Sequence, residues 1–313
     1  MKLLMKRAVL LTTTLATALL LGTTVVVLSS DSASLAATSL YPDLKTLTPT
    51  DLRFDTATIG GGTHKVLRFS NTVWNAGEGR MELRATTVKT TTGKKTRVRQ
   101  RIYDDAGGYT TRLAGDMVYH ATHNHFHFEN FVSYELWTRT AYDNWVASGR
   151  SQGQAQRRAT KTTFCLMDTR IEKALPGTPS SAYYTQCGQS FQGISVGWGD
   201  TYRYSLPDQW IDLGTSNLAN GDYVLRSVAD PNNRLYESAN KNNSARESAQ
   251  ANEAVTFFSV DGSTITVSNP PSAATAQQRT QQETTTLAET TMQPETTTVE
   301  QTVPSGQEDF GAQ

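Results

Sequence analysis

Short segments in which apolar and polar residues alternate dominate the middle of the chain. They predict β-strands over residues 66–74, 81–85, 97–103, 128–137, 208–213 and 223–228. A period of two places successive side chains on opposite faces of a strand, as in a sheet with one buried face. Turn residues separate these segments, and 91–95 is expected to be a hairpin tip. The pattern predicts an all-β protein with a single β-sandwich-like domain and long loops. Residues 152–160 are expected to form either a short helix or a polar loop.

The N-terminal end departs from this pattern. Lys2, Lys6 and Arg7 precede an apolar, threonine-rich run over 8–28, and small residues follow at 36–37. Basic, apolar and small-residue regions in this order predict a secretory signal peptide over 1–37. Because the apolar run is long, an uncleaved N-terminal anchor is the alternative. After cleavage we expect no stable membrane insertion and a secreted, extracellular protein, either free or associated with the cell surface.

The C-terminal end is also unlike the middle. From residue 271 the chain is rich in Thr, Gln and Glu, and Phe310 is its only aromatic residue. Such a composition cannot bury enough apolar surface to offset the entropy lost on ordering. We therefore expect a disordered tail over 271–313, which leaves 38–270 for the folded domain.

Charge excludes one broad class of partner. The chain has 29 basic and 29 acidic residues and a formal net charge of zero, which argues against a strongly basic nucleic-acid-binding protein. We expect no nucleic-acid partner. Arg97, Arg99 and Arg101 nevertheless alternate along one predicted strand. This stripe is either a docking surface for an anionic polymer or a solvated strand face.

Histidines are the most informative residues of the chain. Four of the five lie within eight residues, and His123, His125 and His127 alternate. On an extended chain these three side chains point to one side. If the strand bends, a metal bonded ~2.0 Å from each imidazole can lie among them. The spacing predicts a metal site, and neutral imidazoles suit Cu²⁺ or Zn²⁺ alike.

The other residues of this segment have different expected roles. Phe126 and Phe128 should face away from the metal and pack into the core, because they flank His127 on the opposite side of the strand. His120 is out of phase with the three ligands, so we expect it to lie behind them or to face a substrate. Export places the two cysteines of the chain, Cys165 and Cys187, in an oxidising compartment where they can form a disulfide.

Several motifs together resemble the lysyl oxidase family. They comprise a His-x-x-His-x-His-x-His segment (120–127), Lys-x-x-Phe-Cys-Leu-x-Asp-Thr (161–169), Asp-Thr-Tyr (200–202), Gln-Trp-Ile-Asp (209–212), Pro-Asp-Leu (42–44) and an acidic turn ending in Asn-Asn (237–243). The resemblance spans about residues 41–245 and preserves the order of the motifs. The small number of cysteines in this chain departs from the animal enzymes of the family, which are richer in disulfides.

The resemblance implies a copper-dependent primary amine oxidase of the protein-lysine 6-oxidase type. Such enzymes convert primary amines, such as peptidyl lysine, to aldehydes with molecular oxygen, and release ammonia and hydrogen peroxide. The implied cofactor is lysine tyrosylquinone, a cross-link between Lys161 and Tyr202. His123, His125 and His127 are the implied copper ligands.

Other expectations remain open at the level of sequence. Proton abstraction from the substrate needs a nearby carboxylate or histidine, for which Asp200 and His120 are candidates and Asp168 is a third. The resemblance also implies a Ca²⁺ site, whose alternative is a hydrogen-bonded turn, at Asp43, Leu44, Glu237, Asn242 and Asn243. The rival function is a non-catalytic, metal-binding module of a cell surface or matrix, in which the quinone never forms.

Overall fold

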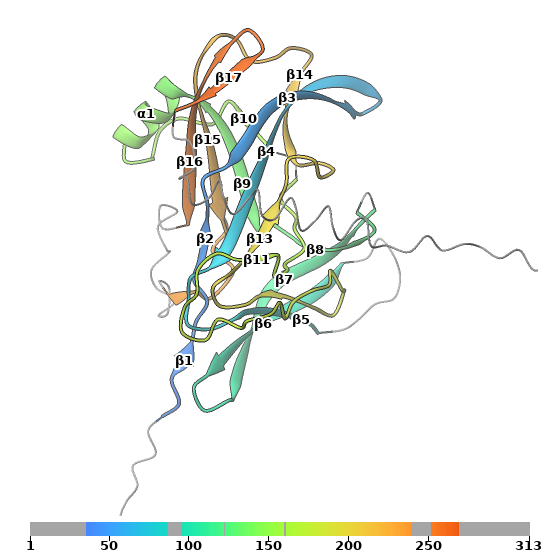
Figure 1. The fold of residues 1–313 in the computed structure, drawn as a ribbon, viewed down its shortest axis with the longest axis vertical. Coiled ribbons are helices and arrows are strands. Elements are labelled where there is room, and N and C mark those ends of the chain that lie inside the picture. The colour runs from blue at the N-terminus through green and yellow to red at the C-terminus, as the bar shows by residue number, and fades with distance from the viewer. Residues whose placement is uncertain (1–35, 87–94, 122, 160, 239–251, 269–313) are drawn as a thin grey trace, which may run out of the picture. The chain divides into compact units, whose positions relative to one another are not determined.

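The computed structural model describes residues 36–86, 95–121, 123–159, 161–238 and 252–268 (Figure 1). Within these residues the chain forms seventeen strands and one α-helix, so the all-β prediction is confirmed. Most of the predicted signal peptide, residues 91–94 of the predicted hairpin tip and all of the predicted tail lie outside the described residues. Their assignments and the domain boundaries at 38 and 270 stay predictions.

The first sheet carries the histidine segment. Its strands run in the order β12-β5-β6-β7-β8, with β1 also paired to β6. The strands are β1 (Ser39–Leu40), β5 (Met81–Ala85), β6 (Thr96–Asp104), β7 (Tyr109–His120), β8 (His125–Phe128) and β12 (Phe191–Ile194). All neighbouring pairs are antiparallel, and short turns join β6 to β7 and β7 to β8.

The second sheet is organised around one long strand, β4. It pairs with four partners, which gives the sheet its order β11-β13-β4-β14 with β2 and β3 also on β4. The strands are β2 (Leu44–Thr46), β3 (Thr50–Ile59), β4 (Gly62–Asn75), β11 (Arg170–Ile171), β13 (Trp198–Tyr202) and β14 (Trp210–Gly214). Seven consecutive residues of β4 from Phe69 to Asn75 are buried or nearly so, which indicates that both faces of the strand are covered here.

The third sheet has the order β10-β9-β15-β16-β17 and carries the helix. Its strands are β9 (Val132–Thr138), β10 (Arg157–Arg158), β15 (Gly221–Ala229), β16 (Glu253–Asp261) and β17 (Thr264–Val267). Helix α1 (Arg139–Ala147) begins directly after β9, where the Thr138 hydroxyl accepts the Ala141 N–H at 3.3 Å as an N-cap. Tyr142 and Trp145 of α1 then pack on Trp137 of β9 at ring distances of 6.1 and 5.0 Å.

Two details of the predicted strand pattern were wrong, and one helix was missed. The strand expected over 128–137 is divided into β8 and β9, which belong to different sheets, because Asn130 adopts a left-handed conformation (φ 57°) that reverses the chain. The strand expected from residue 208 begins only at Trp210, since Asp208 is also left-handed (φ 62°). The described part of 152–160 agrees with the loop alternative apart from the two-residue strand β10, whereas helix α1 was not predicted.

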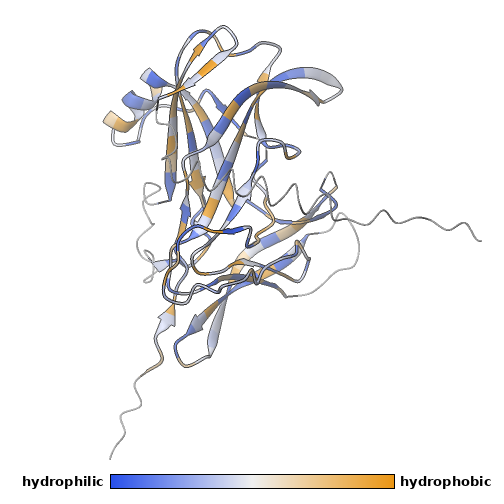
Figure 2. Cartoon of the chain, viewed as in Figure 1, coloured by the Kyte–Doolittle hydropathy of each residue, from blue (hydrophilic) through white to orange (hydrophobic). Residues whose placement is uncertain are grey.

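The core is rich in aromatic residues that lead to the candidate site. Phe69 packs on Tyr134 at 4.7 Å between ring centroids, Tyr134 on Phe164 at 6.0 Å, and Phe164 on Tyr202 at 4.4 Å. These rings are all buried, and burial of an apolar side chain of this size contributes roughly 1.5–3 kcal/mol. Figure 2 shows the corresponding alternation of hydrophobic and hydrophilic residues along the strands. Among the described helices, none is long and apolar enough to cross a bilayer.

Candidate metal centre and cofactor site

The turn between β7 and β8 brings the histidines together. Strand β7 ends at His120 and β8 begins at His125, and the antiparallel register places these two residues opposite each other. Within the turn, His123 N–H donates to the His120 carbonyl at 3.2 Å, and Asn124 is left-handed (φ 55°). The prediction that all three histidines lie on one bent strand was therefore only partly right, and their role as ligands stays a prediction. His125 and His127 lie on β8, whereas His123 lies in the turn.

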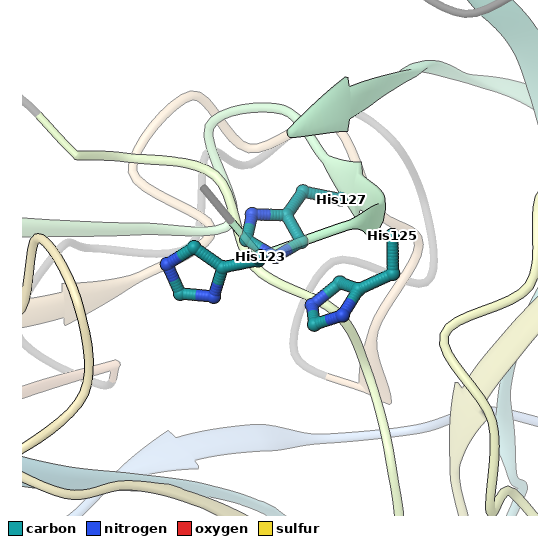
Figure 3. Close-up of side chains that lie close together, drawn as sticks. All are labelled: His123, His125 and His127. Carbon is teal, nitrogen blue, oxygen red and sulfur yellow. The ribbon is translucent and has the colours of Figure 1, made fainter. Parts of the chain in front are cut away.

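Three imidazoles converge beside this turn (Figure 3). One ring nitrogen from each of His123, His125 and His127 lies within 4.8 Å of the others, which is close enough for a shared metal ion. His127 is fully buried, and Phe128 behind it is fully buried in the core as predicted. Phe126 is only half-buried and packs on Tyr119 at 5.5 Å.

The environment keeps these imidazoles neutral, which is the form that binds a metal. Burial, reinforced by the nearby charge of Lys161, lowers the pKa of His123 to about 4 and that of His127 to about 2. The pKa of His125 is lowered for the same reasons. His127 Nδ1 lies 3.2 Å from the Thr163 hydroxyl, while its buried Nε2 has no hydrogen-bond partner among the described residues. A buried nitrogen with a free lone pair and a fixed ring fits a metal ligand.

His120 lies beside the predicted ligands, and its expected role stays a prediction. Its ring stacks on His127 at 4.7 Å with an interplanar angle of 25°. His120 also belongs to a second group of three potential ligands, with His123 and Asp208, whose ligand atoms lie within 4.8 Å of one another. Burial lowers the pKa of His120 as well.

Lys161 lies between the histidines and Tyr202. Its side chain is almost completely buried, and its Nζ lies 3.4 Å from His123 Nε2 and 3.3 Å from the Pro207 carbonyl. The same Nζ lies 5.6 Å from the centroid of the Tyr202 ring. Burial lowers the pKa of Lys161 to about 8, so that the neutral amine is accessible near physiological pH.

Tyr202 and Asp200 form a buried pair on β13. The Tyr202 hydroxyl contacts Asp200 Oδ2 at 2.8 Å and also the Cys165 carbonyl. Burial raises the pKa of Asp200 to about 8 and that of Tyr202 well above its usual value. Both groups therefore mostly hold their protons at neutral pH.

The predicted Cys165–Cys187 disulfide is present, with the two Cα atoms 5.4 Å apart. It fastens the segment that carries Lys161 to the loop before β12. The Cys187 carbonyl also accepts the N–H of Phe126 at 3.2 Å, which joins the same loop to β8. The disulfide thus connects the segment around Lys161 to the strand that holds two of the three histidines.

Two aspartates differ from what the sequence suggested. Asp168, a candidate base, is buried and accepts N–H groups of Tyr183, Tyr184 and Ser195 at 2.8–3.1 Å, together with the Ser195 hydroxyl at 2.7 Å. These four hydrogen bonds connect Asp168 to the segments that contain Tyr183, Tyr184 and Ser195, and they indicate a structural role. Asp208 was missed: its Oδ2 lies 3.9 Å from His123 Nε2. No periodicity marks it, and its only sequence signal is its place directly before the Gln-Trp-Ile-Asp motif.

The predicted calcium residues are only partly described. Glu237 is fully buried and joins the two ends of the domain by accepting the N–H of Leu44 and the side-chain amide of Asn252. Asp43 pairs with Lys45 at 2.8 Å. The Glu237 contacts favour the hydrogen-bonded alternative, because N–H groups occupy both of its carboxylate oxygens. Asn242 and Asn243 lie outside the described residues, so the calcium site stays a prediction.

Comparisons with known proteins agree with this arrangement. The lysyl oxidase family model matches residues 82–259. Lysyl oxidase homolog 4 of Mus musculus is 32% identical over 130 residues, which cover 41% of this chain and 15% of that protein. Lysyl oxidase homolog 3B of Danio rerio is 33% identical over 129 residues, covering 41% of this chain and 14% of that protein. The chain thus matches only a small part of the length of these curated relatives. Because the family model covers more than half of the chain, this protein belongs to the lysyl oxidase family.

Proposed function

We propose that this protein is an extracellular copper-dependent amine oxidase that acts on primary amines such as peptidyl lysine. The observation that carries the proposal is the position of Lys161 Nζ, 3.4 Å from His123 Nε2 and 5.6 Å from the Tyr202 ring centroid. A lysine, a tyrosine and a histidine cluster are the parts from which lysine tyrosylquinone would be made. In the overall reaction, an amine, oxygen and water give an aldehyde, ammonia and hydrogen peroxide.

Copper is the metal that we assign to His123, His125 and His127. The donor set supports this choice, since imidazole nitrogens suit Cu²⁺. The buried, unpartnered Nε2 of His127 and the low pKa values of the ligands support a metal of some kind at this position. Zinc suits the same donors, so protein made without copper is expected to carry it.

When bound, copper and the quinone supply the redox chemistry, and the chain's own residues position and deprotonate the reacting groups. Lys161 must present a neutral amine to form the cross-link, and burial provides this by lowering its pKa to about 8. Tyr202 is held by its hydroxyl contacts with Asp200 and the Cys165 carbonyl, which orient the ring edge-on to Phe164. The closed aromatic surroundings keep bulk water away from this ring.

Asp200 is the base that we assign, because it contacts the Tyr202 hydroxyl at 2.8 Å. A carboxyl with a pKa near 8 exchanges a proton readily near neutral pH, which is what general base catalysis requires. His120 remains the second candidate, since it stacks on His127 and belongs to the group that contains Asp208. Asp168 is the weakest of the three candidates, because its carboxylate already accepts four hydrogen bonds from Tyr183, Tyr184 and Ser195.

The decisive experiment is peptide mass spectrometry after copper loading in air. A linked peptide pair containing Lys161 and Tyr202 is expected in the wild type, and it should be absent from Tyr202→Phe. The matched control is Tyr204→Phe, because the Tyr204 ring packs against Arg53 of β3, with the Arg53 Cζ 3.9 Å from the ring centroid, and should not affect the link. Phenylhydrazine should give a coloured adduct only with protein that carries the link.

The alternative function makes the opposite prediction. If copper-loaded, aerated protein yields both peptides unlinked and no coloured adduct, the amine oxidase proposal is wrong. The protein would then be a non-catalytic metal-binding module of a cell surface or matrix.

A further inference from the structure

A basic pocket lies on the first sheet, at residues separate from the histidine cluster. It has a volume of about 420 Å³ and is lined by Arg97, Arg112, Leu113, Ala114, Gly115, Asp116, Asn233 and Arg234. The pocket forms where β7 carries a bulge, since Val98 and Arg99 of β6 pair with Gly115 and Leu113 and leave Ala114 as the extra residue. Bulges redirect side chains locally, and here the result is a hollow with three arginines.

The three guanidinium groups come from three different segments. Arg97 belongs to β6, Arg112 to β7, and Arg234 to the loop after β15. Arg97 is paired with Asp116 at 2.9 Å. Neither Arg112 nor Arg234 makes an ion pair with a carboxylate among the described residues. Three cations against one anion leave the lining with a formal charge of about +2.

Arg112 is held in place by an aromatic ring rather than by an acid. Its Cζ lies 3.3 Å from the centroid of the Tyr236 ring. Burial lowers the pKa of Arg112, while Tyr236 and Asp230 favour its charge. A guanidinium stacked in this way keeps its in-plane N–H groups available, and a partly desolvated cation gains most from a bound anion.

Arg234 is placed by a rigid loop. The Asp230 carboxylate accepts the N–H groups of Arg234 and Leu235 at 3.0 and 2.8 Å, and the buried Gln100 amide exchanges two hydrogen bonds with the Tyr236 backbone at 2.8 and 2.9 Å. Arg234 then reaches over the bulge, where a Cβ on Gly115 would lie 3.3 Å from its Nη1. The absence of a side chain at residue 115 therefore makes room for this guanidinium.

We propose that this pocket binds a tetrahedral oxyanion, sulfate or phosphate, either free or as an ester on a polymer. Arginine forks match such groups through paired N–H···O bonds. Guanidinium groups that come from three different segments suit an anion with three or four oxygens better than a planar carboxylate with two. The formal charge of the lining also matches a dianion.

The test is titration calorimetry with sodium sulfate and sodium phosphate on the full mature chain, with chloride added to keep the ionic strength constant. Saturable binding to a single site is expected in the wild type. Arg234→Gln and Arg112→Gln should each weaken it about tenfold or more, because each removes charge-assisted hydrogen bonds. The matched control is Arg139→Gln, an arginine of α1 that pairs with Asp143 far along the chain from the pocket, and it should bind normally. Melting temperatures establish that each variant is folded.

A sulfated hexasaccharide distinguishes the two sources of the anion. If it binds more tightly than inorganic sulfate and loses this gain in Arg234→Gln, the ligand is an ester on a polymer. If the hexasaccharide binds no more tightly than inorganic sulfate, and binding is lost in Arg234→Gln, the ligand is a free anion. Either outcome supports the proposal that the pocket binds an oxyanion. No saturable binding of any probe, or an equal loss in Arg139→Gln, overturns the proposal. Copper content and cross-link formation should not change in Arg234→Gln, so this test is independent of the proposed oxidase activity.

Discussion

The Tyr202 hydroxyl donates a hydrogen bond to Asp200 Oδ2 at 2.8 Å, and both side chains are buried. The two residues lie on one strand at positions i and i+2, which places their side chains on the same face. The proposed cofactor ring and the proposed base are therefore carried by the same element. This arrangement fixes their separation without help from a mobile loop.

Asp200 should make the stability of the metal-free protein depend on pH. Its folded pKa is raised to about 8 from 3.8, so between these values the folded state binds the proton more tightly than the unfolded chain. Stability should then fall as the pH rises, with a slope of at most ~1.4 kcal/mol per pH unit from this group. Urea unfolding of Asp200→Asn across the same range should show a shallower decline than the wild type.

Asp212→Asn is the matched control for this slope, because the half-exposed Asp212 has a lowered pKa. The Asp212→Asn variant should still show the decline in stability as the pH rises. Parallel curves for the wild type and Asp200→Asn would contradict the assignment of a proton to buried Asp200.

Replacing one predicted ligand should abolish tight metal binding. His125→Ala removes one of three converging imidazoles, and we expect a loss in copper affinity of at least ~100-fold, since even replacing a residue that hydrogen-bonds to a metal ligand costs ~10–100-fold. Metal analysis after dialysis measures this loss. His64→Ala is the control, as His64 is the histidine outside the cluster and pairs with Asp212 at 2.9 Å. Stoichiometric copper in His125→Ala would show that the ligand set is wrong.

Cross-link formation should accelerate with pH and then level off. Addition to an oxidised tyrosine ring requires the neutral amine of Lys161, and the pKa of this group is lowered to about 8 by burial. The rate should therefore rise as Lys161 loses its proton and reach a plateau above about pH 8, or lower once Cu²⁺ repels the ammonium further. Quenched samples analysed by peptide mass spectrometry give the rate. A cross-linking rate that still rises near pH ~10.4, the pKa of a free lysine, would contradict this prediction.

Removing the disulfide should destabilise the protein. Cys165 and Cys187 are 22 residues apart, for which the chain-entropy model gives about 3 kcal/mol. The double variant Cys165→Ser/Cys187→Ser should melt roughly 6–12 °C below the wild type, at ~2–4 °C per kcal/mol for a domain of this size. Wild-type protein in a strong reductant should melt at the same temperature as the double variant. Equal melting temperatures with and without the bridge would refute the prediction.

The strands and the clustering of three histidines were the most predictable features. Six alternating segments correspond at least in part to described strands, because the period of two is a local property of the sequence. The spacing of the three histidines is local in the same sense. The disulfide was predictable by elimination, since the chain has only two cysteines.

Where the chain reverses was less predictable. Asn124, Asn130 and Asp208 all adopt left-handed conformations, which divide one expected strand, shorten another and bend the histidine segment. Asn and Asp permit this conformation but do not require it. The choice is made by pairing with distant strands, such as β15 on β9, and that information is absent from a short window of sequence.

The sequence by itself determined the period of the strands, the spacing of the imidazoles and the identity of the one pair of cysteines. Only the tertiary structure decided that Lys161 Nζ lies between His123 and the Tyr202 ring, that Asp208 joins this group, and that three arginines line one pocket. The physical reason is that each of these contacts joins residues from different strands or loops, so it exists only after the sheets have paired and buried their shared core.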